Sequence, residues 1–207
     1  MKTLIICDDY WHPASTIRNG LGTLEGFTFD WIENANDWSA DRMAEYPLVL
    51  FAKSNNTSQA DKNPWITEDV QKAFVDYVRK GNGLLAVHSG TVYAKYPILR
   101  RLFGGAFSHH PEQCPVTVEP QNGHPLTAGS TTFTLSDEHY FMELDDSQAD
   151  VFLTTTSVNG TQPGGWTRSE GNGRVCVLTP GHTIEVWQHE SFKTLLRNAL
   201  RWCGRME

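Results

Sequence analysis

Short apolar segments alternate with helix-like segments through the first half of the chain. Leu4–Cys7, Phe27–Ile32 and Leu48–Lys53 have the length and the apolar content that are typical of strands. Between them, Ala14–Leu24 and Ser39–Glu45 have the residue spacing of helices. Strands that alternate with helices in this way predict parallel β-α-β units, with helices on both faces of one sheet.

The strongest helical pattern is followed at once by the most apolar strand. Thr67–Lys80 has its apolar residues on one helical face, and Gly81-Asn82-Gly83 provides a stop signal. Leu84–Val87 is a continuous apolar run of the kind found in central strands that are covered on both faces. We therefore predict that Leu4–Cys7, Leu48–Ala52 and Leu84–Val87 are neighbouring central strands.

The second half of the chain changes character. Cys114–Val118, Thr132–Leu135 and Val151–Thr155 are short predicted strands with loops between them, and they indicate a short antiparallel extension. Arg174–Leu178 returns to the buried-strand pattern, and Glu190–Trp202 predicts a closing helix. No repeat or linker interrupts the chain, so the sequence predicts one α/β domain over residues 1–207 with a mainly parallel central sheet.

Composition excludes several classes of partner. The formal net charge is −7 and the basic residues are scattered, so no basic face for nucleic acid is expected. No apolar stretch reaches the length of a membrane span. The four cysteines, Cys7, Cys114, Cys176 and Cys203, show no CxxC spacing, and three of them lie in apolar runs. These features favour a cytoplasmic protein without disulfides that binds a small polar molecule.

His88 is the most informative single residue. It ends the Leu84–Val87 strand and is followed by Ser89-Gly90-Thr91, a turn of small residues. Ligands of open α/β sheets bind beyond the carboxyl ends of strands, and hydrolases of this general build place a nucleophile at such a corner. The pattern therefore indicates a nucleophile elbow that carries an imidazole. The alternative is a structural histidine that bonds a nearby backbone carbonyl.

Two more histidines follow predicted strands, and an acidic pair lies on a loop. His12 comes after the first strand and His182 after Arg174–Leu178, so both could converge on His88 at one edge of the sheet. Glu138 could orient an imidazole or act as a general base. A solvated acidic loop is the alternative interpretation.

The rim of such a cleft has further candidates. Trp166 and Arg168 offer a stacking surface and a hydrogen-bonding fork that suit a sugar, although they could simply precede a hairpin turn at Gly171-Asn172-Gly173. His109 and His110 are neighbours on an extended segment, so only one of them can face the cleft, and we favour His110.

Nucleotide and standard metal motifs are absent from the sequence. It contains no Walker loop, GxGxxG, HExxH or tight Cys/His zinc spacing. A divalent metal such as zinc, held by distant histidines, remains open. His124, which precedes Pro125, is expected to shape a turn, and His189 is expected to be structural at a helix start.

Taken together, these motifs resemble the ThuA-like, trehalose-utilisation family in the same order along nearly the whole chain. The motifs that carry the resemblance are Leu84–Gly90, Gly104-Gly105 with Phe107 and His110-Pro111, His124-Pro125-Leu126-Thr127, Asp137-Glu138 with Tyr140, Trp166-Thr167-Arg168, Gly173-Arg174-Val175, Gly181-His182 and Leu196–Trp202. The resemblance implies the flavodoxin-like three-layer sandwich of class I glutamine amidotransferases. It also implies that His88 replaces the amidotransferase cysteine, so glutaminase activity is expected to be absent.

The resemblance also implies a role in the catabolism of a disaccharide or a 3-keto glycoside, with a functional link to a sugar oxidoreductase. We predict acid–base catalysis by His88, Glu138 and His182. The residues predicted to bind the sugar substrate are His12, His110, Tyr140, Trp166 and Arg168.

Three points stay open at this stage. The enzyme could be a hydrolase, a lyase or an isomerase, and it could form a homo-oligomer. The alternative from a different class is a non-catalytic carbohydrate-binding or regulatory module on the same scaffold. The polar loop Ser54–Asn63 matches no family feature and could shape substrate choice.

Overall fold

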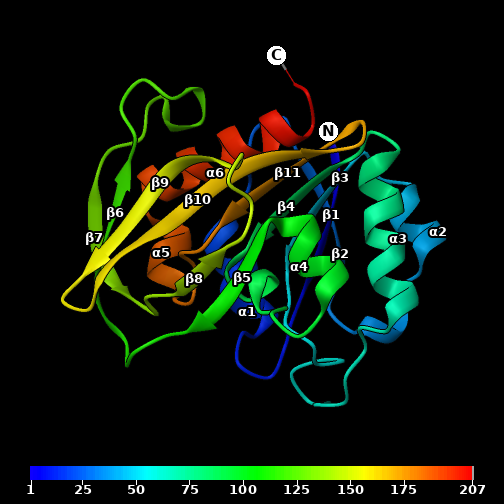
Figure 1. Cartoon of the computed structure of the whole chain (residues 1–207). Coiled ribbons are helices and arrows are strands. Elements are labelled where there is room, and N and C mark those ends of the chain that lie inside the picture. Colours follow the sequence, from blue (N-terminus) through cyan, green and yellow to red (C-terminus); the bar gives the residue numbers. More distant parts are fainter. Residues whose placement is uncertain (207) are drawn as a thin grey trace.

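A computed structural model describes residues 1–206 and shows a mixed α/β architecture (Figure 1). The helices are α1 Ala14–Leu21, α2 Ala40–Ala44, α3 Glu68–Arg79, α4 Pro97–Phe103, α5 Ile184–Gln188 and α6 Glu190–Cys203, with short 3-10 turns η1 Ala35–Asp37, η2 His88–Thr91 and η3 Pro125–Thr127. The strands are β1 Lys2–Cys7, β2 Thr28–Ile32, β3 Leu48–Ala52, β4 Gly83–Val87, β5 Gly105–His109, β6 Cys114–Pro120, β7 Phe133–Asp137, β8 Phe141–Leu144, β9 Asp150–Ser157, β10 Gly160–Glu170 and β11 Gly173–Leu178.

One nine-stranded sheet organises the molecule, in the order β2-β1-β3-β4-β11-β10-β9-β6-β7. The first five strands in this order run parallel, and the remaining four continue the sheet with antiparallel pairing. β5 and β8 form a separate antiparallel pair. The predicted neighbours β1, β3 and β4 are confirmed as central strands, and the fold is the expected sandwich with a parallel core and an antiparallel extension.

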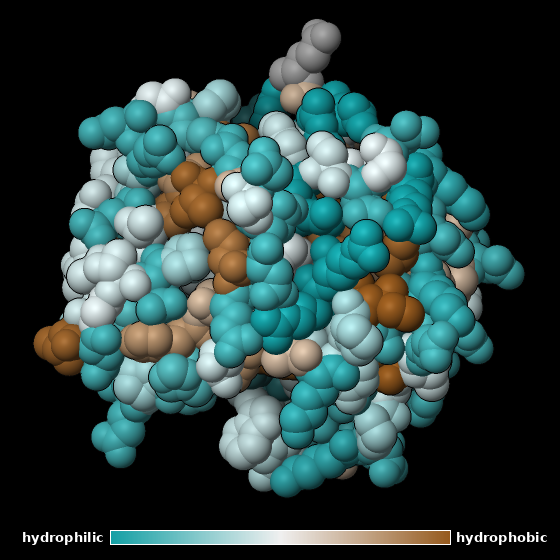
Figure 2. Space-filling model, viewed as in Figure 1, coloured by the Kyte–Doolittle hydropathy of each residue, from teal (hydrophilic) through white to brown (hydrophobic). Residues whose placement is uncertain are grey.

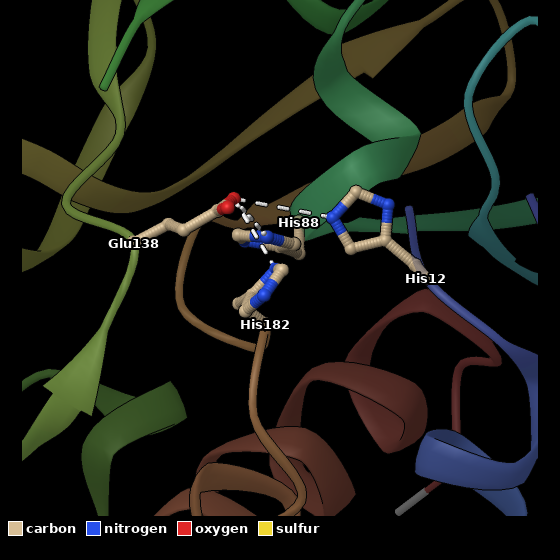
Figure 3. A group of neighbouring side chains, drawn as sticks. All are labelled: His12, His88, Glu138 and His182. Atoms are coloured by element: carbon tan, nitrogen blue, oxygen red, sulfur yellow. Dashed lines mark ion pairs between the residues drawn. The ribbon is translucent and has the colours of Figure 1, made fainter. Parts of the chain in front are cut away.

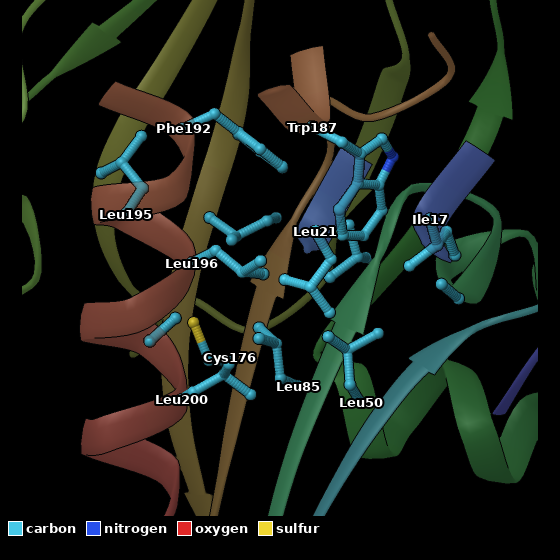
Figure 4. Close-up of a cluster of buried hydrophobic side chains, with 14 of the residues drawn as sticks. Ile17, Leu21, Leu50, Leu85, Cys176, Trp187, Phe192, Leu195, Leu196 and Leu200 are labelled. Atoms are coloured by element: carbon cyan, nitrogen blue, oxygen red, sulfur yellow. The ribbon is translucent and has the colours of Figure 1, made fainter. Parts of the chain in front are cut away.

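The parallel strands are covered on both faces, which explains why their sequences are apolar without alternation. In β3, Leu48, Leu50 and Ala52 face the layer that contains α1, α5 and α6, as Figure 4 shows for the core around Leu50. Val49 and Phe51 face the opposite layer, which contains α2, α3 and α4. Successive strand residues therefore pack into two different cores, because side chains alternate across a sheet.

A buried lysine joins the carboxyl ends of three strands. The Lys53 side chain is fully buried, and its ammonium donates hydrogen bonds to the carbonyl oxygens of Cys7, Asp8 and Glu33. Burial lowers the pKa of Lys53, while the aspartates nearby oppose that shift. This contact fixes the sheet edge at which the candidate site lies.

Several boundaries differ from those expected. The first helix ends at Leu21 rather than Leu24, because Gly22 leaves helical geometry with φ of 59°. Three strands, β5, β8 and β10, were not expected, and β10 with β11 forms the hairpin that Gly171-Asn172-Gly173 indicated. The structural roles expected for His124 and His189 are confirmed, since each side chain accepts a backbone N–H at the start of a helical turn.

The outer surface of the described chain has few large hydrophobic features. Figure 2 shows that the face seen in Figure 1 is mostly hydrophilic, with small and separate hydrophobic patches. Every helix within residues 1–206 is too short or too polar to cross a membrane.

Candidate functional site

Three histidines and one glutamate meet beyond the carboxyl ends of the parallel strands (Figure 3). His12 follows β1, His88 follows β4, His182 follows β11, and Glu138 comes directly after β7. One donor atom from each of the four side chains lies within 4.8 Å of the others. The structure thus brings together the residues for which acid–base catalysis was predicted, His88, Glu138 and His182. His12, which was expected to converge on them and to bind substrate, lies in the same cluster.

The His88 backbone has a conformation that side chains rarely adopt. Its φ is 46°, in the left-handed region, which costs roughly 1–2 kcal/mol for a residue with a Cβ atom. Two residues later, a Cβ atom on Gly90 would lie 2.0 Å from the Phe51 carbonyl oxygen. The strand therefore turns sharply against β3, and this strained corner aims the imidazole across the sheet edge.

The orientation of the His88 ring follows from its buried partner. Nδ1 lies 2.8 Å from the Thr179 carbonyl oxygen, and a carbonyl can only accept, so Nδ1 carries the hydrogen. Nε2 then presents its lone pair 3.3 Å from Oε2 of Glu138. Tyr140 stacks on the ring with a centroid distance of 4.0 Å, and burial lowers the pKa of His88. The predicted alternative, a bond to a backbone carbonyl, is thus present and leaves the second nitrogen free for chemistry.

Asp9 orients His12 in the same way. Its carboxylate accepts Nδ1–H of His12 at 2.8 Å and also the backbone N–H groups of Trp11 and Ser54. Burial opposes ionisation of Asp9, but these hydrogen bonds lower its pKa to about 2. The other ring nitrogen, Nε2, points toward Glu138 Oε2 at 4.0 Å.

His182 is positioned through its backbone by a second buried aspartate. Asp137 accepts the N–H groups of Gly181 and His182, each at 2.9 Å. Burial raises the pKa of Asp137, although these backbone hydrogen bonds oppose the shift. The result places Nδ1 of His182 3.3 Å from Oε2 of Glu138.

The cluster has the donor set of a divalent metal site. His12 Nε2, His88 Nε2 and His182 Nδ1 are buried and make no hydrogen bond within the described residues. All three face one oxygen of Glu138, and a neutral imidazole lone pair aimed at a carboxylate oxygen is repulsive. Ligands at about 2.0–2.1 Å from a tetrahedral zinc ion lie roughly 3.3–3.4 Å apart, close to the two 3.3 Å separations found here.

Protonation of the histidines is a second way to remove the repulsion between their lone pairs and the Glu138 carboxylate. Burial lowers the pKa of His12, but Asp9 and Glu138 overcome this effect and raise it to about 9. Glu138 in turn has a lowered pKa, because the three imidazoles outweigh the effect of its burial. One carboxylate can neutralise one imidazolium, whereas a single divalent cation accepts all three lone pairs and the carboxylate together. The residues therefore fit a bound metal better than shared protons.

A pocket of about 390 Å³ opens above this cluster. Its lining residues are Trp11, His12, Ser54, Val92, Phe107, His110, Glu138 and Tyr140. His110 lies on the pocket side with Nε2 3.6 Å from Oε1 of Glu138, whereas His109 stacks on Phe141 and does not line the pocket. The choice of His110 over His109 therefore agrees with the structure.

The predicted rim positions of Trp166 and Arg168 are wrong. Trp166 is fully buried and donates its indole N–H to the Phe103 carbonyl, while Arg168 binds Asp146 and the Leu102 carbonyl. The reason is strand direction. β10 runs antiparallel to β11, so residues after Gly165 move away from the edge at which β11 ends.

The sequence assigned no role to two important residues. Asp9 and Asp137 do not face the pocket, but each fixes the position of a histidine. The available signal was local: Asp9 follows a predicted strand three residues before His12, and Asp137 precedes Glu138 directly. Carboxylates that orient ligand histidines are a regular feature of metal sites.

For a metal held by this cluster, we expect Asp9→Asn to weaken zinc binding by roughly 10–100-fold, because the amide no longer accepts every N–H that fixes His12. Competition with a chromophoric chelator would measure the affinity. Asp8→Asn is the matched control, since Asp8 is also buried and accepts the backbone N–H groups of Ala14 and Gln59 without touching His12. An equal loss in both variants would contradict a specific role for Asp9.

Sequence comparison assigns the chain to a family. The ThuA family model, described as trehalose utilisation, matches residues 8–203. The protein therefore belongs to the ThuA family, as the motif series indicated, and this membership connects it with carbohydrate metabolism. A search of curated proteins finds no match.

Solved structures show the same fold at low sequence identity. A ThuA-like protein from Parabacteroides merdae is 18% identical with a TM-score of 0.76, covering 99% of this chain and 90% of that one. A ThuA-like protein from Bacteroides uniformis is 22% identical with a TM-score of 0.73, covering 98% and 91%. A protein from Salmonella typhimurium, described as cytoplasmic, is 16% identical with a TM-score of 0.69, covering 98% and 99%.

Proposed function

We propose that this protein is a metal-dependent enzyme of carbohydrate catabolism that acts on an oxidised, 3-keto glycoside. The observation that carries the proposal is the convergence of three buried, unpaired imidazole nitrogens on Glu138 beneath a pocket. The family supports a carbohydrate substrate. A cluster of histidines and a carboxylate favours an enzyme over a binding module, because binding alone does not need such a donor set.

Within this proposal, His12, His88, His182 and Glu138 hold a divalent ion such as zinc. When bound, the ion would supply Lewis-acid polarisation of a sugar oxygen. The predicted acid–base roles of His88, Glu138 and His182 then become ligand roles. His110 is the remaining imidazole that faces the pocket, and we assign it proton transfer to or from the sugar.

The pocket walls support a substrate that is partly apolar. Val92, Phe107 and Tyr140 supply ring faces and methyl groups, while His110 and Ser54 supply hydrogen-bonding groups. A sugar ring has this mixed character, with apolar C–H faces and polar edges. A keto group acidifies the neighbouring C–H, so proton removal by a nearby base is feasible near neutral pH.

The setting of the reaction follows from the same proposal. The 3-keto substrate has to come from an enzyme that oxidises a sugar hydroxyl, which supports a functional link to a sugar oxidoreductase. We place the protein in the cytoplasm, because all four cysteines are free thiols and a relative of the same fold is described as cytoplasmic.

Turnover of 3-keto glycosides tests the proposal. We expect purified protein to consume members of a 3-keto disaccharide panel, to lose activity after dialysis against EDTA, and to regain it with zinc, manganese or cobalt. Mass spectrometry of the products would identify the reaction, and elemental analysis would identify the metal. Full activity in protein shown to be metal-free would contradict the metal role, and binding of these sugars without turnover would support the binding module instead.

A further inference from the structure

We propose that Tyr10 and Trp11 form an outer subsite that stacks against the second ring of a disaccharide; this inference rests on the proposed function. Large exposed hydrophobic side chains are rare within residues 1–206: Tyr10 is 39% exposed, Trp11 is 68% exposed, and Val158 is 94% exposed. Two of the three are consecutive residues. An exposed aromatic pair beside a pocket is a feature of ligand-binding surfaces.

The position of Trp11 connects it to the candidate metal cluster. Trp11 directly precedes His12 and lines the same pocket as His110 and Glu138. Its backbone N–H donates to Asp9 Oδ1 at 2.9 Å, the same oxygen that accepts Nδ1–H of His12. The buried carboxylate of Asp9 therefore fixes both the His12 imidazole and the backbone of Trp11.

The polar loop Ser54–Asn63 supports this platform from the other side. The Lys62 ammonium lies 3.3 Å from the centroid of the Tyr10 ring, which in turn makes an edge-on contact with Trp11. Backbone N–H groups of Ser54 and Gln59 donate to Asp9 and Asp8. The loop thus holds the aromatic pair in place, and Lys62 adds donors beside it.

The arrangement selects a substrate with two rings. The inner pocket, with Phe107 and Tyr140, accepts the ring that reacts near His110 and Glu138. At the opening of the pocket, the indole of Trp11 then faces the group that is attached to the reacting ring. An indole face stacks well on the C–H face of a pyranose, so a second sugar fits and a monosaccharide leaves the platform unused.

Sugar binding to the zinc-loaded protein tests this subsite. The probes are trehalose, maltose and cellobiose against glucose, titrated by calorimetry so that no turnover is needed. We expect at least one disaccharide to bind about tenfold more tightly than glucose, and Trp11→Ala to remove most of that advantage by weakening disaccharide binding far more than glucose binding. Trp11→Phe keeps an aromatic face and should stay within about threefold of the original protein.

Matched measurements separate the possible outcomes. Val158→Ala removes the other exposed hydrophobic side chain and should change no affinity. Zinc content should stay at the original level in Trp11→Ala, which shows that His12 is undisturbed. Unchanged disaccharide affinity in Trp11→Ala would overturn the subsite alone. Failure of all four sugars to bind the zinc-loaded protein would overturn the subsite, whereas turnover of the 3-keto panel decides the proposed function separately.

Discussion

His88→Ala protein is expected to remain folded, to lose zinc affinity by at least about a hundredfold and to lose turnover of 3-keto glycosides. The imidazole supplies one of the four clustered donor atoms, and the other pocket imidazole, His110, lies beside the opposite oxygen of Glu138. Removing a direct ligand costs a metal site more than the 10–100-fold that is typical of changes to residues that only orient a ligand. Calorimetry with zinc and circular dichroism would measure affinity and folding.

Two further variants keep the His88 prediction testable if alanine perturbs the strained corner. His88→Asn suits the left-handed backbone better than alanine does, yet its side chain is too short to reach the cluster. His189→Ala removes a histidine that caps α6 and is not part of the site, so zinc affinity should be unchanged while stability falls by about 1 kcal/mol. Full zinc affinity in both His88 variants would refute the ligand role.

The central fold was predictable because several physical signals agree. The residues of β3 and β4 are continuously apolar, and only strands covered on both faces need that composition. A strong amphipathic helix, α3, lies between them, which leaves a parallel crossover as the simple connection. The antiparallel extension was less visible, since β10 contains glycines and a proline that weaken the strand pattern.

The inner site was also predictable, and for a general reason. Parallel strands end at one edge, so the residues after β1, β4 and β11 have to converge whatever the loops do. His12, His88 and His182 each follow such a strand. Their distances and ring orientations were not predictable, because these depend on Asp9, Thr179 and loop paths that no local pattern encodes.

The outer part of the site was not predictable, because the convergence of parallel strand ends does not determine which residues lie there. Trp166 and Arg168 have suitable chemistry, but their location depends on the register and direction of an antiparallel strand. Reversing the direction moves a residue from one end of the sheet to the other. Trp11 was overlooked although it precedes His12, since a lone tryptophan in a sequence is as consistent with a core as with a surface.

Gly90→Ala is expected to destabilise the protein by about 3 kcal/mol or more and to weaken zinc binding at the same time. A methyl group there would lie 2.0 Å from the Phe51 carbonyl oxygen and 2.9 Å from its carbon, both backbone atoms of a buried strand. β3 cannot move freely because it is paired on both sides. The turn η2 has to shift instead, and it carries His88.

Urea denaturation and thermal melting would measure the loss in Gly90→Ala, and a fall in melting temperature of roughly 6–12 °C is expected for a domain of this size. Gly123→Ala is the control: its φ is 82°, but a methyl group there meets nothing within 4 Å. That variant should lose only about 1–2 kcal/mol from backbone strain and keep its zinc affinity. The two variants could lose equal stability while Gly90→Ala keeps its zinc affinity. That result would show that the close approach to β3 does not determine how His88 is placed in the candidate metal cluster.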